Sequence, residues 1–197
     1  MSSPLPASPR RLLHRRAIEV EVFAREDGMF EAETRLRDTK TLDVTVGGQP
    51  RRAGEALHEM VLTLVIDAGF GIRAARSESL AVPYAGQCDK HGDAYQRLVG
   101  LNLMKGFRAE VKARLGGVLG CTHLTELCTV LPTAVIQGFA GVVLDTHEGK
   151  DSEQQPYQID RCHALRADGP VVQTFYPRWY RGAAAVAAAP VPAASSS

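Results

Sequence analysis

The sequence predicts an α+β fold, in which an antiparallel sheet of about four strands in the N-terminal half is covered on one face by C-terminal helices. Three observations lead to this prediction. Residues 17–39 alternate apolar and polar side chains on both sides of an Asp-Gly turn. Residues 57–82 repeat this arrangement around a second turn. After residue 93 the apolar spacing lengthens to three or four residues, which is typical of helices.

The four strands are expected in two hairpins. The first consists of AIEVEVFARE (17–26) and MFEAETRLRDT, joined at Asp27-Gly28, because Asp-Gly favours the tight turn of a hairpin. VGGQPRRAGE follows and is interpreted as a turn. LHEMVLTLVIDAGFGIRAARSESLAV then predicts two further strands, with a tight turn near Asp67 to Gly71.

Three helical segments are expected next. DAYQRLVGLN is short and amphipathic, and FRAEVKARLGG ends at a glycine pair. A third, more apolar helix begins at Thr122 and is expected to kink or restart at Pro132, since proline lacks the backbone N–H that a helix interior needs. Residues 145–156 are interpreted as a polar loop, and Val171 to Tyr176 as a last strand or an extended arm.

One domain over residues 10–181 is expected, because a chain of 197 residues holds one substantial core and little more. The segments 1–9 and 182–197 are rich in Ser, Pro or Ala and poor in large apolar side chains. Such composition cannot offset the entropy of ordering, so both segments are predicted to be disordered.

Composition narrows the class of protein. Hydrophobic residues make up 45% of the chain, and 23 basic residues face 22 acidic ones. This balance gives no electrostatic reason for a nucleic-acid or membrane partner. A small-molecule substrate is the partner expected under the first of the functional hypotheses given below. No apolar run approaches the roughly 18 to 20 residues that cross a bilayer, and no apolar stretch follows the basic N-terminal residues. We therefore expect a cytoplasmic protein whose four cysteines are thiols or metal ligands rather than disulfides.

Cysteine and histidine residues lie at several junctions between predicted elements, where side chains from distant segments converge. Thiolate and imidazole groups suit zinc or iron. The sequence therefore predicts a zinc or iron site, with candidate ligands His58, Cys88, Cys121, His123 and Cys162.

The stretch GCTHLTEL leaves three roles open for Cys121: a metal ligand, a nucleophile, or a small apolar residue at a helix start. Residues two apart on a helix point about 200° apart, so Cys121 and His123 can bind one ion only if Cys121 lies outside the regular helix. A helix N-terminus also favours the thiolate form. Cys128 belongs to the apolar stripe of the same helix and is expected in the core.

Two glutamates are candidate catalytic residues. Glu59 and Glu126 neighbour the proposed ligands and are expected to act as general bases or to orient a ligand. For Glu126 the alternative is an acidic residue that complements the helix dipole. The aromatic and basic run FYPRWYR (175–181) either stacks on a ligand or pins the C-terminal arm over the core.

Four segments together resemble the bacterial domain of unknown function 2889. These are HEMVLTLVID, SLAVPYAGQC, RLVGLNLMKGFRAEVKARLGGVLGCTHLTEL and DRCHALRADGPVVQTFYPRWY, and the resemblance extends over roughly residues 10–181. It implies no established activity. It does imply a setting in bacteria that degrade aromatic and related compounds.

The order of elements is also similar to that of U-type iron–sulfur cluster scaffold proteins. In that resemblance His58 takes the place of the first cysteine, Cys88 of the second, and Cys121 with His123 of the Cys/His pair. The sequence departs from the scaffold pattern in having a histidine first and one residue between Cys121 and His123.

Three functional hypotheses result. The first is a metal-dependent enzyme of small-molecule catabolism, with an ion that activates water or a substrate carbonyl. The second is a non-catalytic scaffold or accessory protein that holds a metal or an iron–sulfur cluster. The third is a metal-free enzyme with Cys121 as nucleophile and His123 or His58 as base. The remaining alternative is a purely structural zinc that joins the sheet to the helices, with the function located elsewhere, for example under the FYPRWYR arm.

Overall fold

The computed structural model describes residues 8–90, 92–148 and 153–182. Two compact units divide the chain, Met1–Gly138 and Phe139–Ser197, and each is described by itself. Most of the two segments expected to be disordered, residues 1–7 and 183–197, lies outside the described residues. The expectation of one domain over residues 10–181 stays a prediction.

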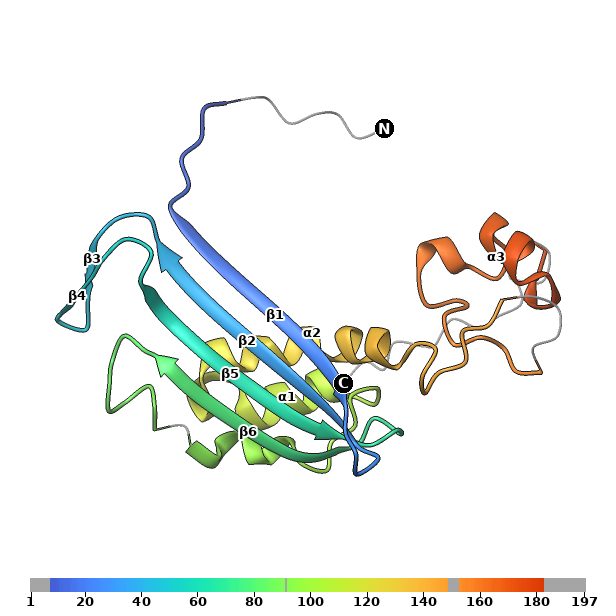
Figure 1. Cartoon of the computed structure of the whole chain (residues 1–197), viewed down its shortest axis with the longest axis horizontal. Helices are drawn as coiled ribbons and strands as arrows, with labels where there is room; N and C mark the ends of the chain where they lie inside the picture. The colour runs from blue at the N-terminus through green and yellow to red at the C-terminus, as the bar shows by residue number, and fades with distance from the viewer. Residues whose placement is uncertain (1–7, 91, 149–152, 183–197) are drawn as a thin grey trace, which may run out of the picture. The chain divides into compact units, whose positions relative to one another are not determined.

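The first unit is built on a four-stranded antiparallel sheet with the order β1-β2-β5-β6 (Figure 1). The strands are β1 (His14–Ala24), β2 (Phe30–Lys40), β5 (Ala56–Ile66) and β6 (Ile72–Ala81). Both predicted hairpins are present. The period-two alternation gives each strand one apolar face, and burial of that face fixes how the strands pair. The α+β fold class and the four-stranded sheet are confirmed.

The two turns form for different reasons. Gly28 takes a φ of 78°, a conformation that glycine adopts without steric cost. At the second turn the Asp67 carboxylate accepts hydrogen bonds from the backbone N–H groups of Gly69 at 2.8 Å and Gly71 at 2.9 Å. The segment interpreted as a simple turn between β2 and β5 forms a small hairpin of β3 (Val44–Val46) and β4 (Gln49–Arg51). Strands of three residues are too short to show the apolar–polar alternation from which the longer strands were predicted.

Helices cover one face of the sheet (Figure 1). They are η1 (Gly92–Leu98), α1 (Phe107–Leu115), η2 (Gly117–Leu119) and α2 (Thr122–Phe139). The helix α2 continues through Pro132 and does not restart there. It approaches β1 closely at its end, where a Cβ atom on Gly138 would lie 2.8 Å from Val22 Cγ1. None of the helices in the described part of the chain is long and apolar enough to cross a membrane.

The face of the sheet under the helices carries the main core. Along β2 the even-numbered residues Ala32, Thr34 and Leu36 are fully buried, and Leu62 and Leu64 of β5 lie beside them. Cys128 of α2 is 1% exposed, which confirms its predicted place in the core. The alternation along β2 continues to Asp38, a charged residue on the buried stripe.

The second unit contains η3 (His163–Leu165), α3 (Pro170–Phe175) and η4 (Pro177–Trp179). The predicted strand or extended arm over Val171 to Tyr176 is wrong, because this segment forms α3. Pro170 occupies the first turn of that helix, where its fixed φ is favourable, and Val172 is fully buried. Tyr176 packs with Ile159, Ala167 and Val172, so part of the FYPRWYR run belongs to the core of its own unit.

Candidate metal centre

Asp38 lies at the centre of a polar cluster between the sheet and the start of α2. It is the register partner of His58 across β2 and β5, and both side chains belong to the helix-facing side of the sheet. His123 reaches the same place from the first turn of α2. The Asp38 side chain is only 2% exposed, compared with 18% for His58 and 24% for His123.

Three potential metal ligands converge here. Asp38 Oδ2 lies 3.2 Å from His58 Nδ1 and 3.7 Å from His123 Nε2. The two imidazole rings are stacked, with centroids 3.8 Å apart. One ligand atom from each of the three residues lies within 4.8 Å of the other two, so Asp38, His58 and His123 form a group that could hold a metal ion.

Two basic side chains from β1 also contact the Asp38 carboxylate. Arg16 donates from Nε to Oδ1 at 2.8 Å and from Nη2 to Oδ2 at 2.7 Å, in a bidentate pair. His14 Nε2 lies 3.2 Å from Oδ1. The Nη1 group of Arg16 bonds Glu126 of α2, so this arginine links β1, β2 and α2.

These contacts determine the protonation states. Burial by itself would raise the pKa of Asp38, but the hydrogen bonds and charge of Arg16, with help from His14 and His58, hold that pKa below its ordinary value. Burial lowers the pKa of His58 and of His123, and the positive charge of Arg16 acts in the same direction. At neutral pH the cluster therefore presents one carboxylate and two neutral imidazoles.

One ligand atom lacks a partner with hydrogen-bond geometry. Among the residues that the structure describes, His58 Nδ1 is buried and accepts or donates no well-formed hydrogen bond, although Asp38 Oδ2 is 3.2 Å away. A buried polar atom without a bond costs free energy. A metal ion placed between Nδ1 and Oδ2 would remove that cost.

Cys121 borders the cluster. It precedes α2, and its carbonyl oxygen accepts the first backbone hydrogen bond of that helix, from the Thr125 N–H. Cys121 is therefore the non-helical cap residue, which is the condition for Cys121 and His123 to bind one ion. Its Sγ is 4.0 Å from His123 Nδ1. The hydroxyl of buried Tyr95 is 3.1 Å from the Cys121 backbone nitrogen and 2.9 Å from its carbonyl oxygen, and fixes this position.

Of the predicted ligands, the structure brings His58, Cys121 and His123 together. Cys88 lies in the turn after β6, where its N–H bonds the Tyr84 carbonyl oxygen, and it does not join the three-residue group found among the described residues. Cys162 is exposed and belongs to the second unit. Glu126 reaches the cluster only through Arg16.

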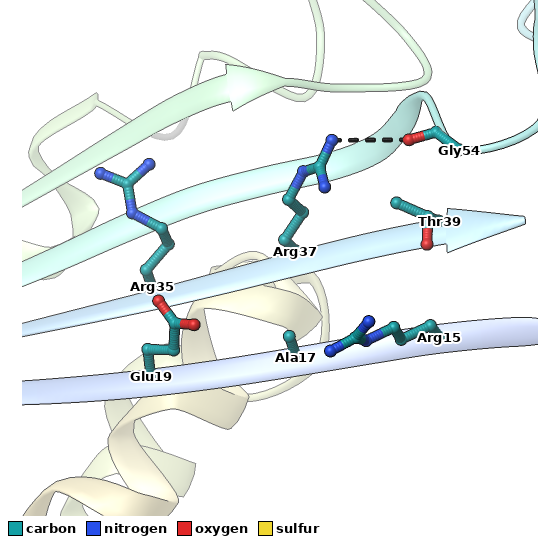
Figure 2. A pocket seen from close by; sticks show the side chains of 7 residues that line it. All are labelled: Arg15, Ala17, Glu19, Arg35, Arg37, Thr39 and Gly54. Atoms are coloured by element: carbon teal, nitrogen blue, oxygen red, sulfur yellow. Dashed lines mark hydrogen bonds between the residues drawn. The ribbon is translucent and has the colours of Figure 1, made fainter.

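Glu59 lies on the opposite face of the sheet from His58, because successive residues of a strand point to opposite sides. Its carboxylate pairs with Arg35 at 2.9 Å and with Arg37 at 3.5 Å. These two arginines line a pocket of about 360 Å³. Figure 2 shows them with the other lining residues, which are Arg15, Ala17, Glu19, Thr39 and Gly54. The structure therefore does not bring Glu59 to the Asp38 cluster.

Sequence reasoning missed Asp38, Arg16 and His14. One signal for Asp38 was present, since it continues the even-numbered stripe that includes Ala32 and Leu36, and a carboxylate on a buried stripe indicates a compensated charge. Arg16 and His14 gave no such signal, because they lie at the N-terminal end of an ordinary amphipathic strand, where basic residues are common.

The comparison with protein families bears on this region. A family model described as "Protein of unknown function (DUF2889)" matches residues 14–137. The chain belongs to the DUF2889 family. The matched range includes Asp38 with the four side chains around it, and also Cys121. We call these five residues the Asp38 cluster: His14, Arg16, Asp38, His58 and His123. No curated protein and no solved structure matches the chain, and nothing supports the similarity to iron–sulfur scaffold proteins.

The Arg16–Asp38 pair of this DUF2889 domain is expected to stabilise the fold. Replacing Arg16 by methionine should lower the free energy of unfolding by about 2–3 kcal/mol, because a buried carboxylate loses a bidentate partner. Urea denaturation measures the change. The matched control is Arg25→Met, which removes an arginine paired with Asp27 and Glu31 at the surface and should have little effect. Equal effects of the two substitutions would contradict the assignment.

The lowered histidine pKa values also predict a dependence of stability on pH. Below the ordinary histidine pKa of 6.5, the unfolded chain binds protons that His58 and His123 do not bind in the folded state. With chelator present, the free energy of unfolding should therefore fall as pH drops from about 7.5 to about 5.5. The double variant His58→Gln/His123→Gln should show a shallower slope, whereas His147→Gln, at an 84% exposed side chain, should not. A wild-type slope equal to that of the double variant would show that His58 and His123 do not cause the pH dependence of stability.

Proposed function

We propose that this DUF2889 protein binds one zinc or iron(II) ion through Asp38, His58 and His123 and acts as a metal-dependent enzyme on a small molecule. The observation that carries the proposal is the convergence of a carboxylate and two neutral imidazoles, whose ligand atoms all lie within 4.8 Å of one another. Imidazole and carboxylate groups are the ligands of zinc and of non-haem iron(II).

The interatomic distances suit such an ion after small side-chain rotations. Nitrogen and oxygen ligands at about 2.1 Å from a metal, at angles between roughly 90° and 110°, lie about 3.0–3.4 Å from each other. The Asp38 Oδ2 distances to His58 Nδ1 and His123 Nε2 are 3.2 Å and 3.7 Å. The stacked rings must open slightly, and Arg16 and His14 can keep their bonds to Oδ1 and orient the carboxylate.

Three protein ligands leave coordination positions open, as in catalytic rather than structural zinc sites. An ion here would supply Lewis acidity to a bound water or a substrate carbonyl. Glu126, at 38% side-chain exposure and bonded to Arg16, is the carboxylate placed to exchange protons with solvent. In this proposal Glu126, rather than Glu59, is the general base.

The broader setting rests on composition and family resemblance. We include in the proposal a cytoplasmic location, a substrate from aromatic or related small-molecule catabolism, and no nucleic-acid or membrane partner. The near-neutral charge balance supports the last point.

Metal analysis tests the site directly. Wild-type protein purified without chelator, or reconstituted with zinc, should hold about one ion per chain. Asp38→Asn and His123→Gln should each weaken zinc binding at least about ten-fold in a competition titration. The matched control is His147→Gln, which should bind as wild type. Stoichiometry below about 0.2 in wild type, or unchanged affinity in both site variants, would refute the proposal.

A second candidate function is favoured by one further arrangement. Cys121 Sγ, His123 and Asp38 follow one another, with 4.0 Å from Sγ to Nδ1 and 3.7 Å from Nε2 to Oδ2. This is the order of nucleophile, base and orienting carboxylate in cysteine enzymes. The first distance is at the long limit of a hydrogen bond to sulfur and the second exceeds hydrogen-bond length, as is common before a substrate closes a site.

Alkylation separates the two functions. If His123 activates Cys121, iodoacetamide should label Cys121 faster than exposed Cys162 in metal-free protein, although Cys121 is only half exposed. His123→Gln should abolish the difference. Cys128 serves as the slow reference, because burial raises its pKa to about 12. Labelling of Cys121 no faster than that of Cys162 would rule out the activated thiol.

A further inference from the structure

We propose that Met60 Sδ, Cys121 Sγ and His123 Nδ1 form a copper(I) site on the opposite side of the His123 ring from Asp38. This inference goes beyond the proposed function, since it assigns the second nitrogen of His123 to a separate site. It adds Met60, a residue outside the carboxylate–histidine group, and a different class of metal.

The three donor atoms come from β5 and from the start of α2, which lies on the helix-covered face of the sheet. Met60 follows His58 by two residues on β5, so both side chains belong to the helix-facing side, and Met60 is 1% exposed. Cys121 caps α2, and His123 begins its first turn. Cys121 Sγ lies 3.8 Å from Met60 Sδ and 4.0 Å from His123 Nδ1.

The two separations measured from Cys121 Sγ match a metal bound beside that sulfur. Ligand sulfurs at about 2.3 Å from a metal, with angles of roughly 110–120°, lie about 3.8–4.0 Å apart, and a sulfur and a nitrogen about 3.5–3.8 Å apart. The sulfur pair already has the required distance. The Sγ–Nδ1 distance needs to shorten by only a few tenths of an ångström.

The ligand types select the metal. A thioether is a poor ligand for zinc or iron(II), whereas thiolate and thioether together suit copper(I). Binding releases the Cys121 thiol proton, so the thiolate balances the single positive charge of the ion. Neutrality matters because the site adjoins the apolar core, with Leu36 beside Met60 in the sheet register and Leu124 on α2, each at most 1% exposed.

The His123 ring couples this site to the carboxylate side. A neutral imidazole has one nitrogen with a free lone pair and one that carries a proton. Coordination through Nδ1 therefore leaves Nε2 protonated and able to donate to Asp38, whereas coordination of zinc through Nε2 protonates Nδ1. Zinc and copper(I) should compete for the chain rather than bind together.

The test is an anaerobic titration of the full chain with the bicinchoninate complex of copper(I). Wild-type protein should take up about one copper(I) per chain, and Met60→Leu should bind at least about ten-fold more weakly. Leucine is close to methionine in volume, and circular dichroism verifies that the variant folds. The matched controls are Met104→Leu, at a side chain in an exposed position, and Cys162→Ser, and both should bind as wild type.

Further arms separate this inference from the proposed zinc or iron site. Asp38→Asn should lose zinc and keep copper(I), and saturating zinc should lower copper(I) affinity in wild type but not in Asp38→Asn. Equal affinity of Met60→Leu and wild type, or loss of copper(I) in Cys162→Ser, would overturn the copper site. Zinc bound normally with no copper(I) uptake would refute this inference alone, and copper(I) bound normally with no zinc uptake would refute the proposed function alone.

Discussion

The buried carboxylate of Asp38 is the constraint on which the arrangement of this domain depends. A charge on the core side of a sheet is costly unless hydrogen bonds and opposite charge compensate it. Here the compensation comes mainly from the bidentate Arg16 of β1, while His58 of β5 and His123 of α2 contribute polar contacts from the other two elements. The cost of leaving Asp38 unpaired therefore ties two neighbouring strands and the start of a helix to β2.

The same arginine sets the conditions for any metal at the cluster. Arg16 already contacts both oxygens of Asp38, so a divalent ion bound there lies close to a fixed positive charge. Repulsion between the two weakens metal binding and at the same time increases the acidity of a water on the metal. An ion in the proposed site would therefore be held less tightly and would carry a more acidic water.

His123 separates two chemically different environments. Its Nε2 faces the carboxylate and arginine, and its Nδ1 faces the Cys121 sulfur. In the two sites proposed above, the tautomer of this ring decides whether its nitrogen is offered to the carboxylate side or to the sulfur side. The position of that ring depends on the cap of α2, which buried Tyr95 holds through the Cys121 backbone.

The sequence by itself determined the local structure and part of the site. Period-two alternation with glycine turns predicted the hairpins, and four-residue spacing predicted α1 and α2, because both patterns involve neighbours along the chain. His58, Cys121 and His123 stood out as ligand types at element junctions. The prediction for the last segment was wrong, since Val171 to Tyr176 follows Pro170 in a short helix rather than forming a strand or an extended arm.

Only the tertiary structure decided which side chains meet. Arg16 pairs with Asp38 across 22 residues and with Glu126 across 110, and no local pattern records such a distance. The alternation of side chains along the strands placed Asp38 on the helix-covered face of the sheet and Glu59 on the opposite face. Register and helix docking depend on burial summed over the whole unit, so the partners of a buried charge follow from the fold rather than from the residues beside it in the chain.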